Sequence, residues 1–463
     1  MKYTLLATTL GALLLPALAN SETAVKSGGD TTVFDKSRNA FSLPARNLSI
    51  LRRDNFFIGN AFFKQPWVAA PASTKARDGL GPLFNTNTCQ SCHVKDGRGR
   101  PPLNDAEDFL SALVRLSIPA TTDAHQAQLI QSGVIPEPTY GDQLQPSAIP
   151  GIKGEGRPAI SYEEITGEFT DGSPYSLIKP TPRIDDLNYG ELHPDTLMSV
   201  RVAPPMIGLG LLDAISEADI LANADPEDAD KDGISGRPNR VWDVQLKQTV
   251  LGRFGWKANQ PNVAQQSAGA FHGDLGVNSE LHPGQNCTAA QVDCHKAIDG
   301  GTPEIPAEIL DKVVFYSSTL AVPARRGTKN PEVTHGEALF AQANCSSCHQ
   351  PEFKTGTHSS IAELSNQTIT PYSDLLLHDM GEGLADNRPD FLASSQEWRT
   401  PPLWGIGLTK TVNAHTRFLH DGRARNLSEA ILWHGGEAEA SKQQYLEMPK
   451  ADRDALIAFL NSL

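Results

Sequence analysis

Two near-identical pentads, CQSCH at 89–93 and CSSCH at 345–349, constrain this chain more than any other part of its sequence. In the spacing Cys-x-x-Cys-His, two thiols on one turn of chain can form thioethers with the vinyl groups of a haem. The histidine that follows is then held beneath the iron as its axial ligand. A bare Cys-x-x-Cys could instead be a redox dithiol or half of a zinc site.

The added histidine and the repeat of the motif favour two covalently bound haem c groups over those alternatives. Each pentad would supply two attachment cysteines and one ligand of the haem iron. The residues predicted to hold the two haems are Cys89, Cys92, His93, Cys345, Cys348 and His349.

Residues 1–19 have the three parts of a secretory signal peptide. Lys2 gives a short positive segment, the stretch 5–15 is apolar, and Ala17-Leu18-Ala19 is a small-residue cleavage site. The alternative is a retained membrane anchor, but the apolar run is shorter than the roughly 20 residues that span a bilayer. We expect a mature protein that is exported to the periplasm and has no membrane span.

The charge and the remaining cysteines narrow the class further. A net charge of −14 argues against a nucleic-acid partner and is compatible with docking of a basic electron-donor protein. Cys287 and Cys294 are the two cysteines outside the pentads. In an oxidising compartment they are expected to form a disulfide, and two free thiols are the alternative.

The chain from 330 to 463 has the features of a small cytochrome c domain. Thr334 and Glu337 have the spacing of a capping box, which predicts the start of a helix that leads into the second pentad. The end of the chain predicts a second, amphipathic helix. Its apolar face would consist of Leu456, Phe459, Leu460 and Leu463.

The preceding part, 20–329, is predicted to be a larger haem domain. Between about 131 and 200 the composition shifts to β-branched and aromatic residues around Asp171-Gly172, which is a hairpin signal. The expected fold is therefore mainly α, with two cytochrome c-like haem domains. The N-terminal domain would be enlarged by this β-containing insertion and by long loops.

An acidic segment, 225–239, resembles a calcium loop. Asp228, Asp230 and Asp232, followed by a glycine, match the first half of an EF-hand-type loop, and Ile234 would add its backbone carbonyl. The twelfth position holds asparagine in place of the usual bidentate glutamate. The alternative interpretation is a solvated acidic turn.

Four longer stretches resemble a known family, the di-haem oxidoreductases. They are GLGPLFNTNTCQSCHVKDGRGRPP, DADKDGISGRPNRV, RFGWKANQPNVAQQSAGAFHGDLG and EWRTPPLWGIGLTKTVNAHTRFLHDGRARNLSEAILWHGGEAEA. Members of this family are exported proteins, often labelled thiol oxidoreductases or peroxidases, and the resemblance covers nearly the whole mature chain. The chain is more distantly similar to bacterial di-haem cytochrome c peroxidases and to MauG, which oxidises tryptophans of a partner protein.

The distant similarity implies that the C-terminal haem is six-coordinate and stores an electron. In those peroxidases the second iron ligand, Met or Tyr, follows fourteen residues after the histidine of a His-Asp-Gly element. Here that element begins at His420, and the implied ligand is His434. Met380 is a competing ligand and His378 a further alternative, whereas His420 is expected to form hydrogen bonds rather than to bind iron.

The same similarity implies that the N-terminal haem reacts with peroxide. Trp256 would carry electrons between the haems, Gln266 would line the distal pocket, and Asp274 would move a proton between the peroxide oxygens. His272 is an alternative base or a displaceable ligand. A core tryptophan and a structural histidine are the simpler interpretations of Trp256 and His272, and Glu155 is an acid without an assigned role.

These features define three functions to be separated. The first is a peroxidase-like oxidoreductase that takes electrons from a redox partner protein and reduces hydrogen peroxide. The second is a non-catalytic di-haem electron-transfer cytochrome, and the third is an oxidant of a partner protein. No His or Met follows soon after the first pentad, which favours an open site there.

The label thiol oxidoreductase finds little support in the sequence, since Cys287 and Cys294 are the only cysteines not assigned to haem.

Overall fold

The computed structural model describes residues 25–105 and 107–463. The predicted signal peptide, 1–19, lies outside the described residues. Within them, no helix has both the length and the apolar character needed to cross a bilayer.

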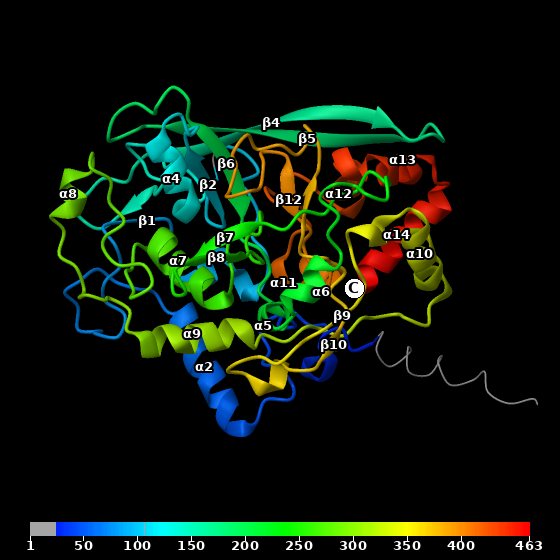
Figure 1. Ribbon diagram of the computed structural model, residues 1–463, viewed down its shortest axis with the longest axis horizontal. Coiled ribbons are helices and arrows are strands. Elements are labelled where there is room, and N and C mark those ends of the chain that lie inside the picture. The colour runs from blue at the N-terminus through cyan, green and yellow to red at the C-terminus, as the bar shows by residue number, and fades with distance from the viewer. Residues whose placement is uncertain (1–24, 106) are drawn as a thin grey trace, which may run out of the picture.

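Helices are distributed along both halves of the chain (Figure 1). Those before residue 330 are α2 (Ile50–Lys64), α3 (Cys89–Cys92), α4 (Asp123–Ser132), α5 (Leu209–Asp213), α6 (Glu217–Leu221), α7 (Val263–Leu275), α8 (Val292–His295) and α9 (Ala307–Ser318). Those after it are α10 (Pro331–Gln342), α11 (Thr409–Asn413), α12 (Leu427–Leu432), α13 (Glu439–Glu447) and α14 (Lys450–Ser462).

Strands form two-stranded antiparallel pairs throughout the described residues. The pairs are β1 (Leu83–Phe84) with β3 (Ser147–Ala148), β2 (Ala112–Ser117) with β6 (Leu197–Val202), β4 (Arg157–Glu168) with β5 (Pro174–Asp185), β7 (Arg240–Asp243) with β8 (Gln248–Leu251), β9 (Phe353–Lys354) with β10 (Thr368–Ile369), and β11 (Leu377–Asp379) with β12 (Glu397–Arg399).

The expectation of a mainly α chain is therefore wrong, because the fold is mixed. Strands are not confined to the predicted insertion; they also occur between α6 and α7 and within the C-terminal third. The physical reason is that long connecting segments must satisfy their backbone N–H and C=O groups, and short antiparallel pairs do this where a helix cannot form.

The predicted hairpin is confirmed, and it reaches the C-terminal helices. β4 and β5 pair over their full length, and Gly172 takes a left-handed conformation at the turn. The Thr170 N–H donates to the carbonyl oxygen of Leu446, and Arg453 binds Asp171 at 2.8 Å. The guanidinium of Arg453 also lies 3.9 Å from the centre of the Phe169 ring. In Figure 1 the hairpin runs along the top of the molecule towards α13, and these contacts fix its tip against the C-terminal helices.

A close helix crossing packs α2 against α9. A Cβ atom at Gly59 would collide with the carbonyl oxygen of Lys312, so only glycine permits this approach. One turn later, Phe63 packs on Tyr316 of α9, with 5.2 Å between the ring centres. Phe63 in turn lies 6.2 Å from the ring of His93 in the first pentad.

The same arrangement recurs where α10 crosses α14. A Cβ atom at Gly336 would collide with the carbonyl oxygen of Ala455. One turn later, Phe340 packs on Phe459, with 5.1 Å between ring centres, and lies 6.1 Å from the ring of His349. Each pentad is therefore preceded by a helix of pattern Gly-x-x-x-Phe whose glycine fixes a crossing and whose phenylalanine contacts the histidine.

The start of α10 differs from the prediction. The helix begins at Pro331, and the Asn330 side chain caps it by accepting from the N–H of Glu332. The predicted capping box is wrong, because Thr334 already lies inside the helix and Glu337 binds the Arg325 guanidinium with both oxygens at 2.8 Å. A proline at the first helical position and an asparagine before it are the stronger start signal.

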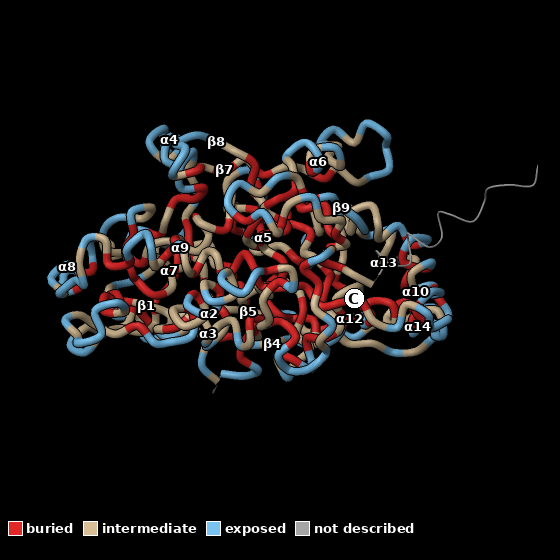
Figure 2. Tube along the Cα trace, turned by 90° about the horizontal axis from the view of Figure 1, so that it is seen from below, coloured by how far each residue is buried: buried red, intermediate tan, exposed pale blue. Residues whose placement is uncertain are grey.

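Buried residues run through the centre of the molecule, from the α7 and α9 side to the α12 and α14 side (Figure 2). The predicted apolar face of the last helix is confirmed: Leu456, Phe459, Leu460 and Leu463 are all buried. They belong to one core cluster with Trp256 and Trp398. The core of the C-terminal part therefore continues into the chain between the pentads.

We predict that Gly336→Ala destabilises the protein, although alanine is normally the better helix residue. The added methyl group would push α14 away from α10, and such overpacking costs about 1–3 kcal/mol. Urea unfolding monitored by circular dichroism measures this change. Thr334→Ala in the same helix is exposed and should stay within about 0.5 kcal/mol of the unmodified protein. A gain in stability for Gly336→Ala would contradict the close crossing.

Candidate functional site

A single cavity of about 870 Å³ is lined by residues of both pentads. Its volume lies at the upper end of the roughly 300–1,000 Å³ typical of ligand pockets. Trp256, one face of α7 and the region around His420 also line it. Two segments more than two hundred residues apart in sequence thus share one internal space.

The first pentad presents a neutral imidazole with one free nitrogen. His93 donates from Nδ1 to the carbonyl oxygen of Pro204 at 2.8 Å, which leaves Nε2 as the available ligand atom. Burial lowers the pKa of His93 to about 4. Burial also raises the pKa of the Cys89 thiol to about 12, and the nearby Asp274 charge adds to this effect. A thiol with so high a pKa is unsuited to a redox Cys-x-x-Cys pair, since the thiolate is the reactive form.

The second pentad repeats this geometry and adds a second imidazole. His349 donates from Nδ1 to the carbonyl oxygen of Tyr372 at 2.9 Å. His434 donates from Nδ1 to the carbonyl oxygen of Ala430, one helical turn back, at 2.7 Å. Burial, with a smaller contribution from nearby His434, lowers the pKa of His349 to about 4. Both histidines therefore keep a free Nε2, and both line the cavity.

His378 cannot act as an iron ligand in this arrangement. Its Nε2 binds Asp374 at 2.7 Å and its Nδ1 binds Glu437 at 2.6 Å, so both ring nitrogens are engaged. Burial alone would lower the pKa of His378, but hydrogen bonds with Asp374, Cys348 and Glu437 raise it well above its ordinary value. Met380 lines the cavity and remains the competing ligand.

His420 takes part in a stacked arrangement that the sequence did not predict. Its ring lies parallel to that of Trp398, with 3.7 Å between the ring centres and 9° between the planes. The ammonium group of Lys257 lies 4.3 Å from the centre of the Trp398 ring and pairs with Asp386 at 3.0 Å. Burial lowers the pKa of His420 to about 4, so its imidazole is neutral. His420 is thus buried against Trp398, and its hydrogen-bonding role stays a prediction.

Trp256 contacts both halves of the cavity wall. Its Nε1 donates to the carbonyl oxygen of Val202 at 2.8 Å, and its ring lies 5.5 Å from the guanidinium carbon of Arg98. The Trp256 carbonyl oxygen accepts from the N–H of Arg399, beside Trp398. Trp256 thus joins the loop after the first pentad to the core of the C-terminal part.

One face of α7 approaches the first pentad with small residues and a few polar groups. Gln266, Gly269 and Gly273 recur at helical spacing and line the cavity. Asp274 accepts from the Gln143 side chain at 2.9 Å. Burial raises the pKa of Asp274, against the opposing effects of the Arg115 charge and the Gln143 hydrogen bond. Glycines on this face leave room for a flat group against the helix.

His272 lies on α7 and forms a pair with His282, a residue that no sequence motif predicted. The ring of His282 stacks on that of His272 with 5.7 Å between centres, and both line the cavity. The Nε2 of His282 is buried without a hydrogen-bond partner among the described residues. Burial lowers the pKa of both histidines, that of His282 to about 4. Both imidazoles are therefore neutral near pH 7.

Glu155 lies behind this wall rather than in the cavity. Its carboxylate accepts from the Gln145 N–H and from the Gln291 side chain. Burial raises the pKa of Glu155 to about 8, despite these hydrogen bonds. Gln145 binds the carbonyl oxygen of Gly273 at 3.0 Å, so Glu155 supports the end of α7. A disulfide joins Cys287 to Cys294 next to Gln291.

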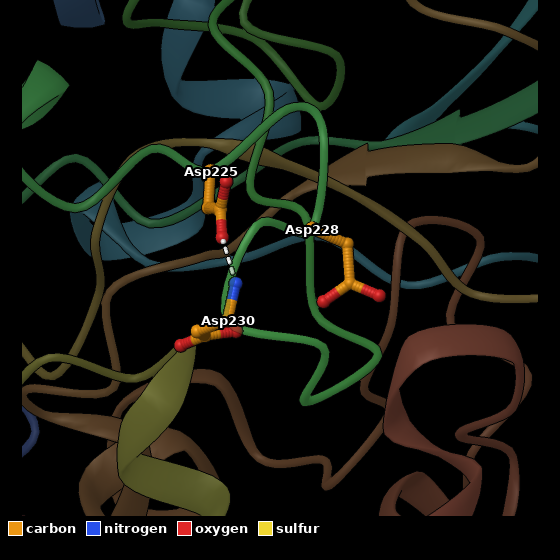
Figure 3. A group of neighbouring side chains, drawn as sticks. All are labelled: Asp225, Asp228 and Asp230. Carbon is orange, nitrogen blue, oxygen red and sulfur yellow. Dashed lines mark hydrogen bonds between the residues drawn. The ribbon is translucent and has the colours of Figure 1, made fainter.

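The acidic loop gathers three carboxylates, but not the three that were predicted. Asp225, Asp228 and Asp230 each offer one oxygen, and these lie within 4.8 Å of one another (Figure 3). Asp232 instead accepts from the N–H of Ile234 at 2.8 Å. Asp225, which precedes the matched pattern, belongs to this group, and Asp232 does not. Calcium binding by this loop stays a prediction.

The residues around both pentads fit haem. Each pentad pairs its histidine with a backbone carbonyl, and the cavity offers neutral Nε2 atoms, glycine-faced helix surface and aromatic walls. Four cysteines, Cys89, Cys92, Cys345 and Cys348, are free thiols that line this cavity.

Comparison with known proteins identifies the family. A family described as "Di-haem oxidoreductase, putative peroxidase" matches residues 22–463, which is nearly the whole chain. No curated protein and no solved structure matches the sequence. The resemblance noted in the sequence is thereby confirmed, and haem is the cofactor that the family implies. The chain belongs to the di-haem oxidoreductase family.

Proposed function

We propose that this protein is an exported di-haem c-type cytochrome that acts as a peroxidase-like oxidoreductase. Cys89 and Cys92 would attach the first haem and Cys345 and Cys348 the second. When bound, the two irons supply one-electron chemistry and the reaction with peroxide. The overall change is hydrogen peroxide plus two electrons and two protons to two molecules of water, with the electrons delivered by a redox partner protein.

The repeated helix crossing supports two cytochrome c-like units, 20–329 and 330–463. In both, a glycine-mediated crossing fixes the phenylalanine that packs beside the pentad histidine. The hairpin within 131–200 would then be an insertion of the first unit that braces the second. Export to the periplasm follows from the signal-like residues 1–19 and is part of this proposal.

The observation that carries the proposal is the difference between the two axial environments. At the second pentad, His349 and His434 both line the cavity, and each holds its Nδ1 on a backbone carbonyl and keeps Nε2 free. At the first pentad, His93 is held by the carbonyl oxygen of Pro204, and the other two histidines near α7, His272 and His282, stack on each other. The second site can therefore be closed by His434, while the first keeps room for a substrate.

Side chains on the α7 side of the first site have the chemistry that peroxide cleavage needs. Asp274 would accept the proton from one peroxide oxygen and return it to the other, the general acid–base step. Gln266, for whose amide no hydrogen-bond partner is found in the described part of the chain, would hold the substrate by a hydrogen bond. Trp256, placed between the loop of Arg98 and the C-terminal core, would carry electrons between the sites.

The proposal as a whole is tested by absorption and electron paramagnetic resonance spectra of the purified ferric protein, followed by peroxide addition with and without a reductant. We expect one high-spin and one low-spin haem, and turnover of peroxide when reductant is present. Two low-spin haems without turnover would replace the peroxidase by a non-catalytic electron-transfer cytochrome.

We predict that His434→Ala converts one of the two ferric haems from low spin to high spin, because it removes the second imidazole of the C-terminal site. Electron paramagnetic resonance of the purified protein measures the change. Met380→Ala is the matched variant, since Met380 lines the same cavity, and it should leave the spectrum unchanged. The reverse outcome would assign the ligand to Met380.

We predict that Asp274→Asn lowers kcat/KM for peroxide by about 100-fold, which is the size of a general acid–base contribution. The base must be deprotonated, and burial raises the pKa of Asp274 above the ordinary value of about 3.9. The activity of the unmodified protein should thus increase as the pH rises through that raised pKa. This rising part of the pH–activity profile should be absent in the variant.

The matched control for this experiment is Asp54→Asn on the exposed side of α2, where the same atoms change outside the cavity. It should retain the activity and the pH profile. An Asp274→Asn protein with an unchanged pH limb would mean that another group, such as His272 or His282, moves the proton.

A further inference from the structure

Buried arginines in the described residues divide into two groups. Five of the seven have a carboxylate within ion-pair distance. These pairs are Arg201 with Asp390, Arg325 with Glu337, Arg388 with Asp390, Arg423 with Asp421, and Arg453 with Asp171. The other two, Arg98 and Arg399, have none, and both line the cavity shared by the pentads.

Arg98 is held rigidly five residues after His93. Its backbone N–H donates to the Asn413 side chain, and its Nη2 donates to the carbonyl oxygen of Leu419. Its guanidinium lies near the rings of Trp256 and Phe418. The side chain is only 9% exposed, and its Nε has no hydrogen-bond partner in the described chain.

Arg399 is held in a similar way at the end of β12. Its Nε donates to the carbonyl oxygen of Gly255 at 2.9 Å and its Nη1 to that of Thr400 at 3.1 Å. It is 7% exposed. The charge of Asp374 acts on Arg399 and on His349 alike, which places Arg399 on the side of the second pentad.

The carboxylates whose charges act on these two arginines, Asp421 on Arg98 and Asp374 on Arg399, bind other side chains. Asp421 binds Arg423 through Nε at 2.8 Å and Nη2 at 2.7 Å, and Asp374 binds His378 at 2.7 Å. Burial lowers the pKa of both arginines to about 10, which still leaves them charged near pH 7. A buried charge without a counter-ion is costly, and backbone carbonyls or ring faces offset only part of that cost.

We infer that Arg98 and Arg399 are the anion-binding groups of the cavity and take the carboxylate side chains of the two bound haems, Arg98 at the first pentad and Arg399 at the second. This inference rests on the proposed function. Guanidinium forks suit carboxylates in geometry and charge, and haem carries two carboxylates that must enter the protein with it. The two cations without a protein counter-ion would thus be neutralised by the cofactors.

The test is to measure the reduction potential of each haem by potentiometric titration. The purified haem-loaded protein is compared with its Arg98→Gln and Arg399→Gln variants. Ferric haem carries one more positive charge than ferrous haem, so loss of a nearby cation favours the ferric form. We expect the equilibrium constant for reduction to fall at least tenfold, about 59 mV for one electron, at the first haem in Arg98→Gln and at the second in Arg399→Gln. Arg98→Lys and Arg399→Lys, which keep the charge, should shift less than threefold.

Arg326→Gln is the matched control. Arg326 is half-buried and also binds only backbone carbonyls, of Asn461 and Ala324, but it lies outside the cavity. Both potentials should stay unchanged in this variant. If a glutamine variant fails to fold, the lysine variants are compared at increasing pH, and a shift that appears as the lysine loses its charge supports the inference.

Two outcomes would refute this inference and leave the proposed function unaffected. The first is a full complement of covalent haem with unshifted potentials in both glutamine variants. The second is a potential of the unmodified protein that follows the acetate concentration, a dependence lost in the variants, since the anion would then come from solution. Absence of covalent haem in the unmodified protein, measured by its mass, would instead refute the proposed function.

Discussion

Contact between a glycine in one helix and a carbonyl oxygen in another is the constraint on which this structure depends. It occurs at Gly59 against Lys312 and at Gly336 against Ala455. Without a Cβ atom, the helices approach closely enough for Phe63 and Phe340 to reach the pentad histidines. A larger residue would move these rings away and widen the cavity on its histidine side, because packed interiors have little room to adjust.

Charge is arranged around this frame in a consistent way. The buried cations other than Arg98 and Arg399 have carboxylate partners, including Arg201 and Arg388, which also line the cavity. The histidines that line it are neutral, except His378, which two carboxylates hold in its charged form. A neutral imidazole with one engaged nitrogen is the form that can bind a metal ion. The same cavity therefore combines free imidazole nitrogens, a carboxyl group with a raised pKa and two cations without counter-ions.

Prediction from the sequence succeeded where the signal was local and failed where partners were distant. The hairpin at Asp171-Gly172 and the apolar face of the last helix follow from short periodic patterns, and both are confirmed. The capping box failed because Asn330 and Pro331 form a competing start signal four residues earlier. The Gly-x-x-x-Phe pattern before both pentads was readable in the sequence, and it would have pointed to both crossings.

The sequence by itself determined where the two proposed haem sites lie, because five consecutive residues carry all the chemistry that the proposed attachment requires. It also determined the family, through long stretches that the full-length match confirms. Only the tertiary structure decided what surrounds each site. His93 meets the carbonyl of Pro204 across 111 residues, and Arg98 meets that of Leu419 across 321. Such contacts arise from how helices and loops pack, which no local pattern of residues encodes.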